Sequence, residues 1–113
     1  MSYMNLSASD IREVMPPASR GADDALLQQF LDEYQQWLDR ELGGLPDSDI
    51  VLRGILRDLT AARAARKIAT NPQELGMAES LYKDAMGRLE TYSSAASGHD
   101  YGSPAVFFAE APW

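Results

Sequence analysis

The chain has 113 residues, of which 45% are hydrophobic and 24% are charged, so we expect one globular domain with its own core. The sequence has no cysteine, which excludes disulfides, thiolate metal sites and thiol nucleophiles. The net charge of -7 disfavours a nucleic-acid reader built on a basic patch, because phosphate backbones are repelled.

The first predicted element is a short helix that ends before Pro16-Pro17. Ser7 or Ser9 can cap its start, and the apolar residues that follow have helical spacing. Residues 18–21 have the composition of a loop.

The clearest helical pattern lies between residues 25 and 42. Asp23 or Asp24 can cap its start, and Gly43 suits the left-handed conformation that ends many helices. Its apolar residues recur at three- and four-residue steps: Leu27, Phe30, Leu31, Tyr34, Trp37, Leu38 and Leu42. We interpret the aromatic members as part of the core.

A second long helix is predicted over residues 51–69, with Asp47 or Ser48 as its cap. Its later half is rich in alanine, which permits close helix packing. The cations at positions 63, 66 and 67 lie near its C-terminus, where the helix dipole stabilises positive charge. The dipole is thus a sufficient explanation for this basic cluster.

Asn71, Pro72 and Glu74 together form the start signal of a third long helix. Helical spacing continues to about Tyr92, whereas residues 93–98 have the composition of a flexible linker.

We therefore predict an all-α fold, in which one short and three longer helices form a small bundle. The bundle domain covers residues 1–92, and residues 93–113 form a linker and an extended C-terminal tail. The expected core positions are Leu27, Leu31, Tyr34, Leu38, Ile55, Leu59, Leu81, Ala85 and Leu89.

Residues 101–113 have no helical period, contain two prolines and are rich in aromatic side chains. Clustered exposed aromatics mark interaction sites. We expect this segment to dock in extended form on a neighbouring protein, with its own bundle as the alternative surface. The candidate partner-binding residues are Tyr101, Val106, Phe107, Phe108 and Trp113.

No residue pattern indicates catalysis, a metal or a cofactor. His99 stands alone beside Asp100 in the linker, which indicates a solvated loop residue. The acidic residues between positions 32 and 41 could bind Mg²⁺ only with carboxylates from a second helix. That helix offers Asp58 alone, on a face rich in arginine.

Three stretches carry a resemblance to a known family over the chain to about Tyr92. They are residues 6–11 (LSASDI), residues 23–27 (DDALL) and residues 81–89 (LYKDAMGRL). With the Gly/Pro and Asn-Pro breaks between the long helices, their order resembles that of the head-to-tail connector (adaptor) proteins of tailed bacteriophages and related prophage or gene-transfer particles.

The resemblance implies a non-enzymatic virion assembly protein. Such proteins form a homo-oligomeric ring, commonly of twelve subunits, which docks beneath the portal protein and receives the next connector or tail component. Genome DNA passes through the ring without specific binding. The protein would be located at the head-to-tail interface of the virion after assembly in the host cytoplasm. Terminal segments of the family grip the portal, and residues 101–113 would take this part, although this tail is longer and more aromatic.

Two alternatives of other classes remain. One is a small helical regulator or assembly chaperone that binds one partner through its C-terminal tail. The other is a degenerate helical Mg-dependent nucleotide pyrophosphohydrolase. For all three we expect no membrane insertion and no export, because the sequence has no run of about 18 apolar residues and no signal-peptide pattern.

Overall fold

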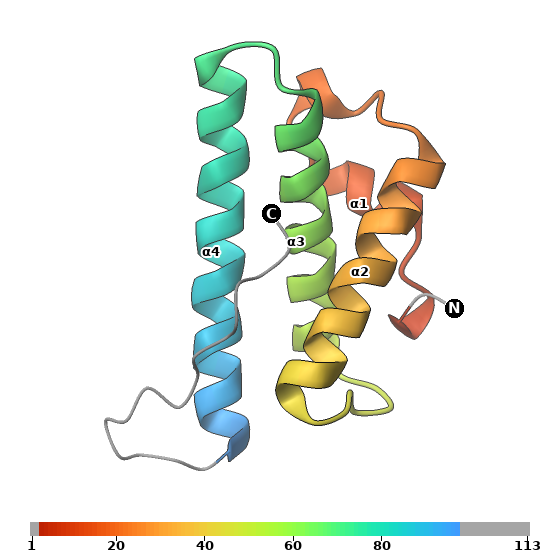
Figure 1. Cartoon of the computed structure of the whole chain (residues 1–113), viewed down its shortest axis with the longest axis vertical. Coiled ribbons are helices and arrows are strands. Elements are labelled where there is room, and N and C mark those ends of the chain that lie inside the picture. The colour runs from red at the N-terminus through yellow and green to blue at the C-terminus, as the bar shows by residue number, and fades with distance from the viewer. Residues whose placement is uncertain (1–2, 98–113) are drawn as a thin grey trace.

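Four α-helices account for most of the residues that the computed structural model describes, 3–97 (Figure 1). They are α1 (Ala8–Val14), α2 (Asp24–Leu42), α3 (Ile50–Ile68) and α4 (Pro72–Ser97), with short 3-10 turns at Tyr3–Asn5 and Pro17–Ser19. This part of the chain contains no strand. The predicted all-α class, with one short and three longer helices, is confirmed.

Side-chain caps start α1 and α4 as the sequence predicts. Ser7 Oγ accepts the backbone N–H of Asp10 at 3.2 Å, and Asp10 Oδ2 accepts the backbone N–H of Ser7 at 3.0 Å. Asn71 Oδ1 accepts the backbone N–H of Glu74 at 2.9 Å, and Pro72 is the first residue of α4. Each cap satisfies backbone donors that have no partner inside the helix.

The connection between α2 and α3 agrees with the prediction at its start and departs from it at its end. Gly43 has φ of 71°, in the left-handed region expected of it. The cap of α3 is Asp49, so the predicted Asp47 or Ser48 is wrong. Asp49 Oδ1 accepts the N–H groups of the second and third helical residues at 2.9 and 3.1 Å. Its other oxygen accepts the hydroxyl of Tyr92 at 2.9 Å, a contact that local sequence does not reveal.

The end of α4 also differs from the prediction. The helix continues to Ser97, so the boundary predicted at Tyr92 is five residues early, and residues 93–97 are not linker. Serine and alanine are frequent in linkers, but neither interrupts a helix that is already propagating. Proline does, and residues 88–97 contain no proline.

Residues 98–113 and residues 1 and 2 lie outside the described part of the chain. The predicted extended tail falls there, together with His99 and all five candidate partner-binding residues. The docking of this segment therefore stays a prediction.

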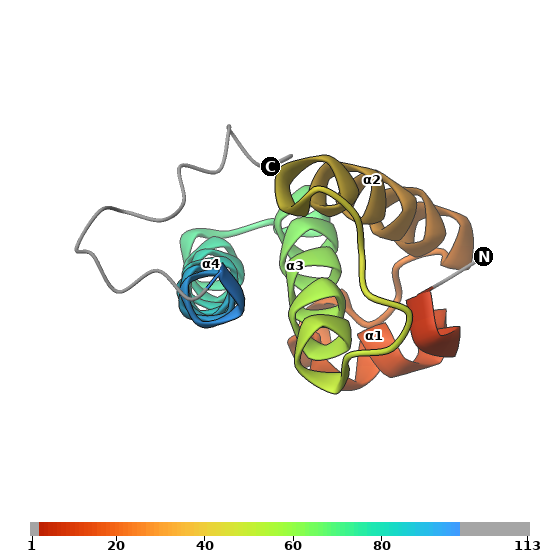
Figure 2. The ribbon, with the colours of Figure 1, turned by 90° about the horizontal axis from the view of Figure 1, so that it is seen from below.

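α3 is the central helix of the bundle. α1 and α2 pack on one side of it and α4 packs on the other, as the end-on view in Figure 2 shows. Its alanines at positions 61, 62, 64 and 65 are all buried. Small side chains around the whole helix allow three neighbours to approach closely, which explains why this helix lies in the middle.

The core contains eight of the nine predicted positions: Leu27, Leu31, Tyr34, Leu38, Ile55, Leu59, Ala85 and Leu89. The ninth, Leu81, is only partly buried. It belongs to α4, which packs mainly on one neighbour and so buries a narrower stripe. The aromatic residues Phe30 and Trp37 are buried with Tyr34, and the rings of Tyr34 and Trp37 meet edge to face at 6.4 Å.

Replacing Leu59 or Leu31 with alanine should lower the free energy of unfolding by about 2 to 5 kcal/mol, because each leaves a cavity in a fully buried site. Denaturant unfolding followed by circular dichroism measures the change. Leu75→Ala is the control, since this leucine is 37% exposed and its loss should cost less than about 1 kcal/mol. A loss below about 0.5 kcal/mol at both core sites would contradict this assignment of the core.

Candidate functional site

A buried carboxylate joins the central helix to α4. Asp58 on α3 is 5% exposed and accepts a hydrogen bond from Arg57 Nε at 2.9 Å through Oδ1. Its Oδ2 pairs with the guanidinium of Arg88 on α4. Both carboxylate oxygens therefore face cations, and through Arg88 this carboxylate links α3 to α4.

Two of the acidic residues between positions 32 and 41 have separate partners. Glu33 pairs with Arg63 of α3, and Asp39 accepts the backbone N–H of Leu45 at 3.2 Å. Among residues 3–97, no group of three or more His, Cys, Asp or Glu side chains converges in a way that could hold a metal ion. The described residues thus provide no candidate metal centre.

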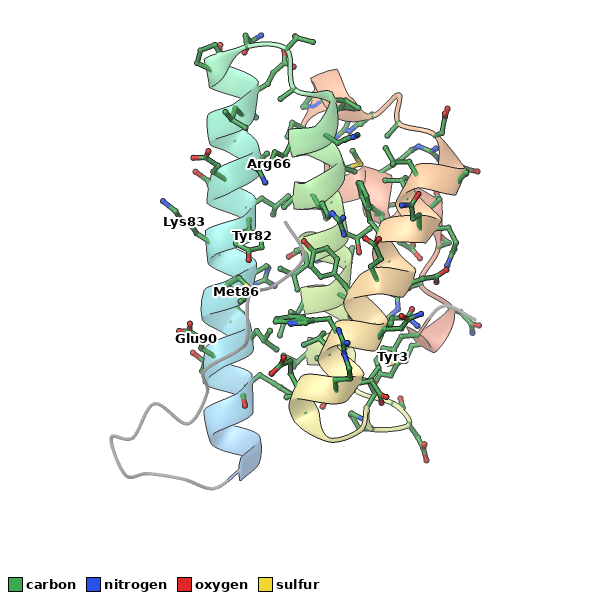
Figure 3. The ribbon with its side chains drawn as sticks, viewed as in Figure 1. Tyr3, Arg66, Tyr82, Lys83, Met86 and Glu90 are labelled. Atoms are coloured by element: carbon green, nitrogen blue, oxygen red, sulfur yellow. The ribbon has the colours of Figure 1, made fainter. Side chains whose placement is uncertain are left out.

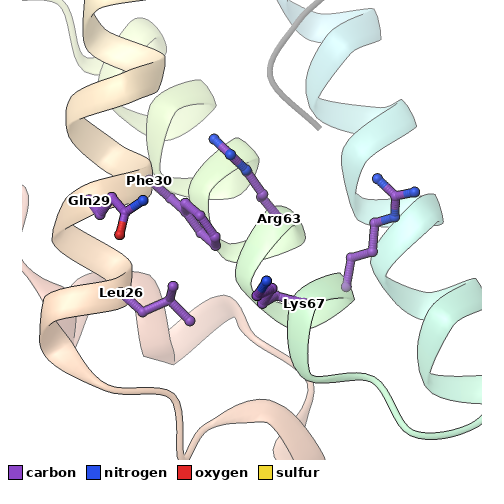
Figure 4. A pocket seen from close by; sticks show the side chains of 6 residues that line it. Leu26, Gln29, Phe30, Arg63 and Lys67 are labelled. Atoms are coloured by element: carbon purple, nitrogen blue, oxygen red, sulfur yellow. The ribbon is translucent and has the colours of Figure 1, made fainter.

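The first candidate site is a cleft between α2 and α3, which we call the basic cleft. Its volume is about 550 Å³. Figure 4 shows the side chains that line it: Leu26, Gln29 and Phe30 from α2, and Arg63, Arg66 and Lys67 from α3. Three of the six are cations and none is acidic, on a chain in which acidic residues outnumber basic ones by 17 to 10. The cleft is therefore a local exception to the charge of the protein.

The inner wall of the basic cleft is held by Arg63. Its guanidinium lies 4.1 Å from the centroid of the Phe30 ring and pairs with Glu33. This cation–π contact and the ion pair fix the arginine side chain in place. Below it lies Tyr34, whose pKa is raised by burial, although the nearby arginines act in the opposite direction. The phenol therefore stays protonated at neutral pH.

The two remaining cations lie at the rim of the basic cleft. Lys67 is exposed and faces Leu26 across the opening (Figure 4). Arg66 points toward α4 (Figure 3). The cleft can thus offer positive charge at its rim and apolar contact at its wall, a combination that suits an acidic ligand with aromatic or aliphatic groups.

The second candidate site, which we call the apolar groove, lies along α4 and has a volume of about 670 Å³. It is lined by Val51, Lys83, Asp84, Gly87, Arg88, Thr91 and Tyr92. Val51 is 53% exposed, and its neighbour Ile50 is 78% exposed. Gly87 has no side chain, and a Cβ at this position would have no other atom within 4 Å, so the groove is open there.

The Tyr92 hydroxyl anchors one end of the apolar groove by its hydrogen bond to Asp49. Burial and this hydrogen bond raise the pKa of Tyr92 to about 12. The N–H of Leu52 and the Tyr92 hydroxyl hold the pKa of Asp49 below its ordinary value. At neutral pH, Tyr92 is therefore a neutral donor and Asp49 an ionised acceptor. Their hydrogen bond holds the tyrosine ring against the start of α3.

A third, smaller surface lies at the opposite end of the bundle, where α4 begins. Met77 is 44% exposed and Leu75 is 37% exposed. Met77 also lines a cleft of about 270 Å³ with Pro16, Pro17, Asn71, Gln73 and Glu74. We call Leu75 and Met77 the turn patch. Ile50 and Val51 form the start patch, so named because they begin α3.

Sequence reasoning did not find the two candidate sites. The spacing of the cations on α3 places them on one helix face. Their position near the C-terminus of the helix was already explained by the helix dipole, so nothing in the sequence indicated a binding cleft. Phe30, which completes the basic cleft, lies 33 positions before Arg63 in the sequence. Val51 has helical spacing with the apolar residues of α3, but the structure leaves it 53% exposed.

Comparison with protein-family models, with curated proteins and with solved structures gave no match for this chain. No helix formed by residues 3–97 combines the length and the apolar character needed to span a bilayer.

Asp58→Asn should lower the free energy of unfolding by about 1 to 3 kcal/mol, because two arginines lose the charge that accepts their hydrogen bonds. The matched control is Asp84→Asn, which removes an exposed carboxylate 3.2 Å from Arg88 Nε and should cost less than about 0.5 kcal/mol. Urea unfolding of both variants gives the comparison. Equal losses would show that Asp58 does not pin α3 to α4.

Proposed function

We propose that this chain is a structural virion assembly protein, a head-to-tail connector that forms a ring beneath a phage portal. The order of its helices and breaks supports the resemblance to that family. The observation that carries the proposal furthest is the presence of exposed apolar residues at two opposite ends of one bundle, the start patch and the turn patch.

The separation of the two patches suits a protein that joins two larger partners. α3 has 19 residues, so its two ends lie about 28 Å apart. Large exposed apolar side chains are unfavourable in water and mark surfaces that a partner covers. A ring subunit stacked between a portal and the next component needs such a surface at each end, besides contacts to its neighbours.

The candidate partner-binding residues of the C-terminal segment complete the proposal. Val106, Phe107, Phe108 and Trp113 supply the kind of aromatic and aliphatic anchors that dominate interfaces with extended segments. In the assembled particle, we assign the segment to a neighbouring protein, with the portal as the first candidate.

The two alternatives differ from this proposal in what they require. A pyrophosphohydrolase needs carboxylates that are available to Mg²⁺, and Asp58 faces two arginines instead. A regulator or chaperone needs one surface and forms a soluble complex of fixed small stoichiometry, whereas a connector forms a ring.

The test is assembly with the portal protein encoded in the same genome, followed by negative-stain imaging. The wild-type protein should add a ring to the portal. Replacing both residues of either patch with serine, or deleting residues 101–113, should lower the yield of complete particles about tenfold or more, because hot-spot losses of 1.4 kcal/mol or more per subunit accumulate around a ring.

The control pair is Glu79→Ser with Glu90→Ser, since both residues are exposed on α4 and line neither candidate site. This pair should assemble normally. Normal yield from the patch variants and the deletion, or a one-to-one soluble complex with the portal, would exclude the connector.

A further inference from the structure

We propose that the basic cleft binds the chain's own C-terminal segment, residues 101–113, while the subunit is free. The inference rests on the proposed function only in that the segment later binds a partner protein. It concerns a surface between α2 and α3 and an occupant of stated chemistry, a stretch with aromatic anchors, one carboxylate side chain and no cation.

Charge complementarity is the first argument. Residues 101–113 contain one acidic residue, Glu110, and neither lysine nor arginine. The basic cleft presents three cations and no carboxylate among its lining residues. Arg63 is already paired with Glu33, so the exposed Lys67 at the rim is the cation best placed to attract the carboxylate of Glu110.

The apolar chemistry of the two surfaces also agrees. Leu26 and the Phe30 ring give the cleft an apolar wall, and the guanidinium carbon of Arg63 lies 4.1 Å from the centroid of that ring. Phe107 or Phe108 can extend this apolar and cation–π cluster from the open side of the cleft. A cleft of about 550 Å³ lies within the range of sites that enclose such groups.

The reach of the chain is the third argument. The pair between Asp58 and Arg88 shows at which level α3 and the antiparallel α4 face each other. Lys67 lies nine residues beyond Asp58 toward one end, and Ser97 lies nine residues beyond Arg88 toward the other. The two are therefore about 27 Å apart along the bundle. An extended chain covers about 3.3 Å per residue, so the stretch from Val106 to Phe108 reaches the cleft from Ser97.

The occupant is the chain's own segment and not that of a second copy. A segment tethered within reach of its site has an effective concentration in the millimolar range, far above that of a neighbouring subunit in dilute solution. Binding in this way covers the aromatic anchors of the free subunit. The intramolecular contact is reversible, so a partner that binds the segment more tightly can displace it from the cleft during assembly.

Limited proteolysis of the full-length protein tests the proposal. Chymotrypsin cleaves after aromatic residues, and mass spectrometry follows loss of the segment at Phe107 and Phe108. Lys67→Glu should accelerate this cleavage about threefold or more, because it reverses a charge at the rim of the cleft, whereas Lys67→Arg should leave it unchanged. High salt should accelerate cleavage of the wild type.

Lys83→Glu is the matched control. It makes the same charge change on an exposed lysine of α4 that points away from α2 and α3 (Figure 3). Its cleavage rate should equal that of the wild type. Melting temperatures of all variants separate loss of the contact from loss of the fold.

A second measurement identifies the site directly. In two-dimensional NMR spectra, replacing Phe107 and Phe108 with alanine should shift the amide resonances of Arg63 and Lys67 and leave that of Lys83 in place. Equal cleavage of wild type and Lys67→Glu, or unmoved cleft resonances, would overturn the proposal. Protection that grows when the protein concentration is raised about tenfold would assign the cleft to a neighbouring copy instead. None of these measurements involves a portal, so their outcome is independent of the assembly test.

Discussion

The close packing of three helices around α3 is the constraint on which the rest of the structure depends. Its alanine-rich half permits this, because helix axes approach to within the lower end of the usual range only when the side chains between them are small. Ala78 and Ala85 on α4 are buried as well. A helix surrounded in this way has little surface left for polar groups, so Asp58 remains inside only because Arg57 and Arg88 neutralise it.

Both candidate sites follow from this arrangement. α2 and α4 lie on different sides of α3, so each leaves a furrow where it meets the central helix, and long side chains line these furrows. At the C-terminal end of α3, the helix dipole favours the cations Arg66 and Lys67, and Phe30 of α2 holds Arg63 beside them. At the other end, Asp49 caps the helix and draws Tyr92 onto it, which leaves Ile50 and Val51 uncovered. Electrostatics thus concentrates cations near the C-terminal end of α3, whereas its N-terminal end carries a capping carboxylate and exposed apolar residues.

The helices and their caps at Ser7, Gly43 and Asn71 could be predicted because each depends on residues within a few positions of one another. Helical spacing also identified the buried faces. It did not identify which faces meet, so the basic cleft, whose walls come from Phe30 and Arg63, stayed hidden. Asp49 was missed as a cap although its capping contacts are local, because three candidate residues, Asp47, Ser48 and Asp49, stand side by side; only its contact with Tyr92, 43 positions away, lies beyond local sequence. Composition was a poor guide only at the end of α4, where residues typical of linkers extend a helix that packing has already formed.

A segment that first binds its own cleft and later a partner imposes a condition on that partner. The partner must offer more free energy than the intramolecular contact, which benefits from a high effective concentration. A single weak site would fail this condition. On the proposed function, a ring of identical portal subunits would meet it more easily, because one connector that has released its segment would be held beside the next, and each contact would raise the effective concentration for its neighbours. Protection of the segment in the free subunit and its release on a ring would then be two consequences of one competition.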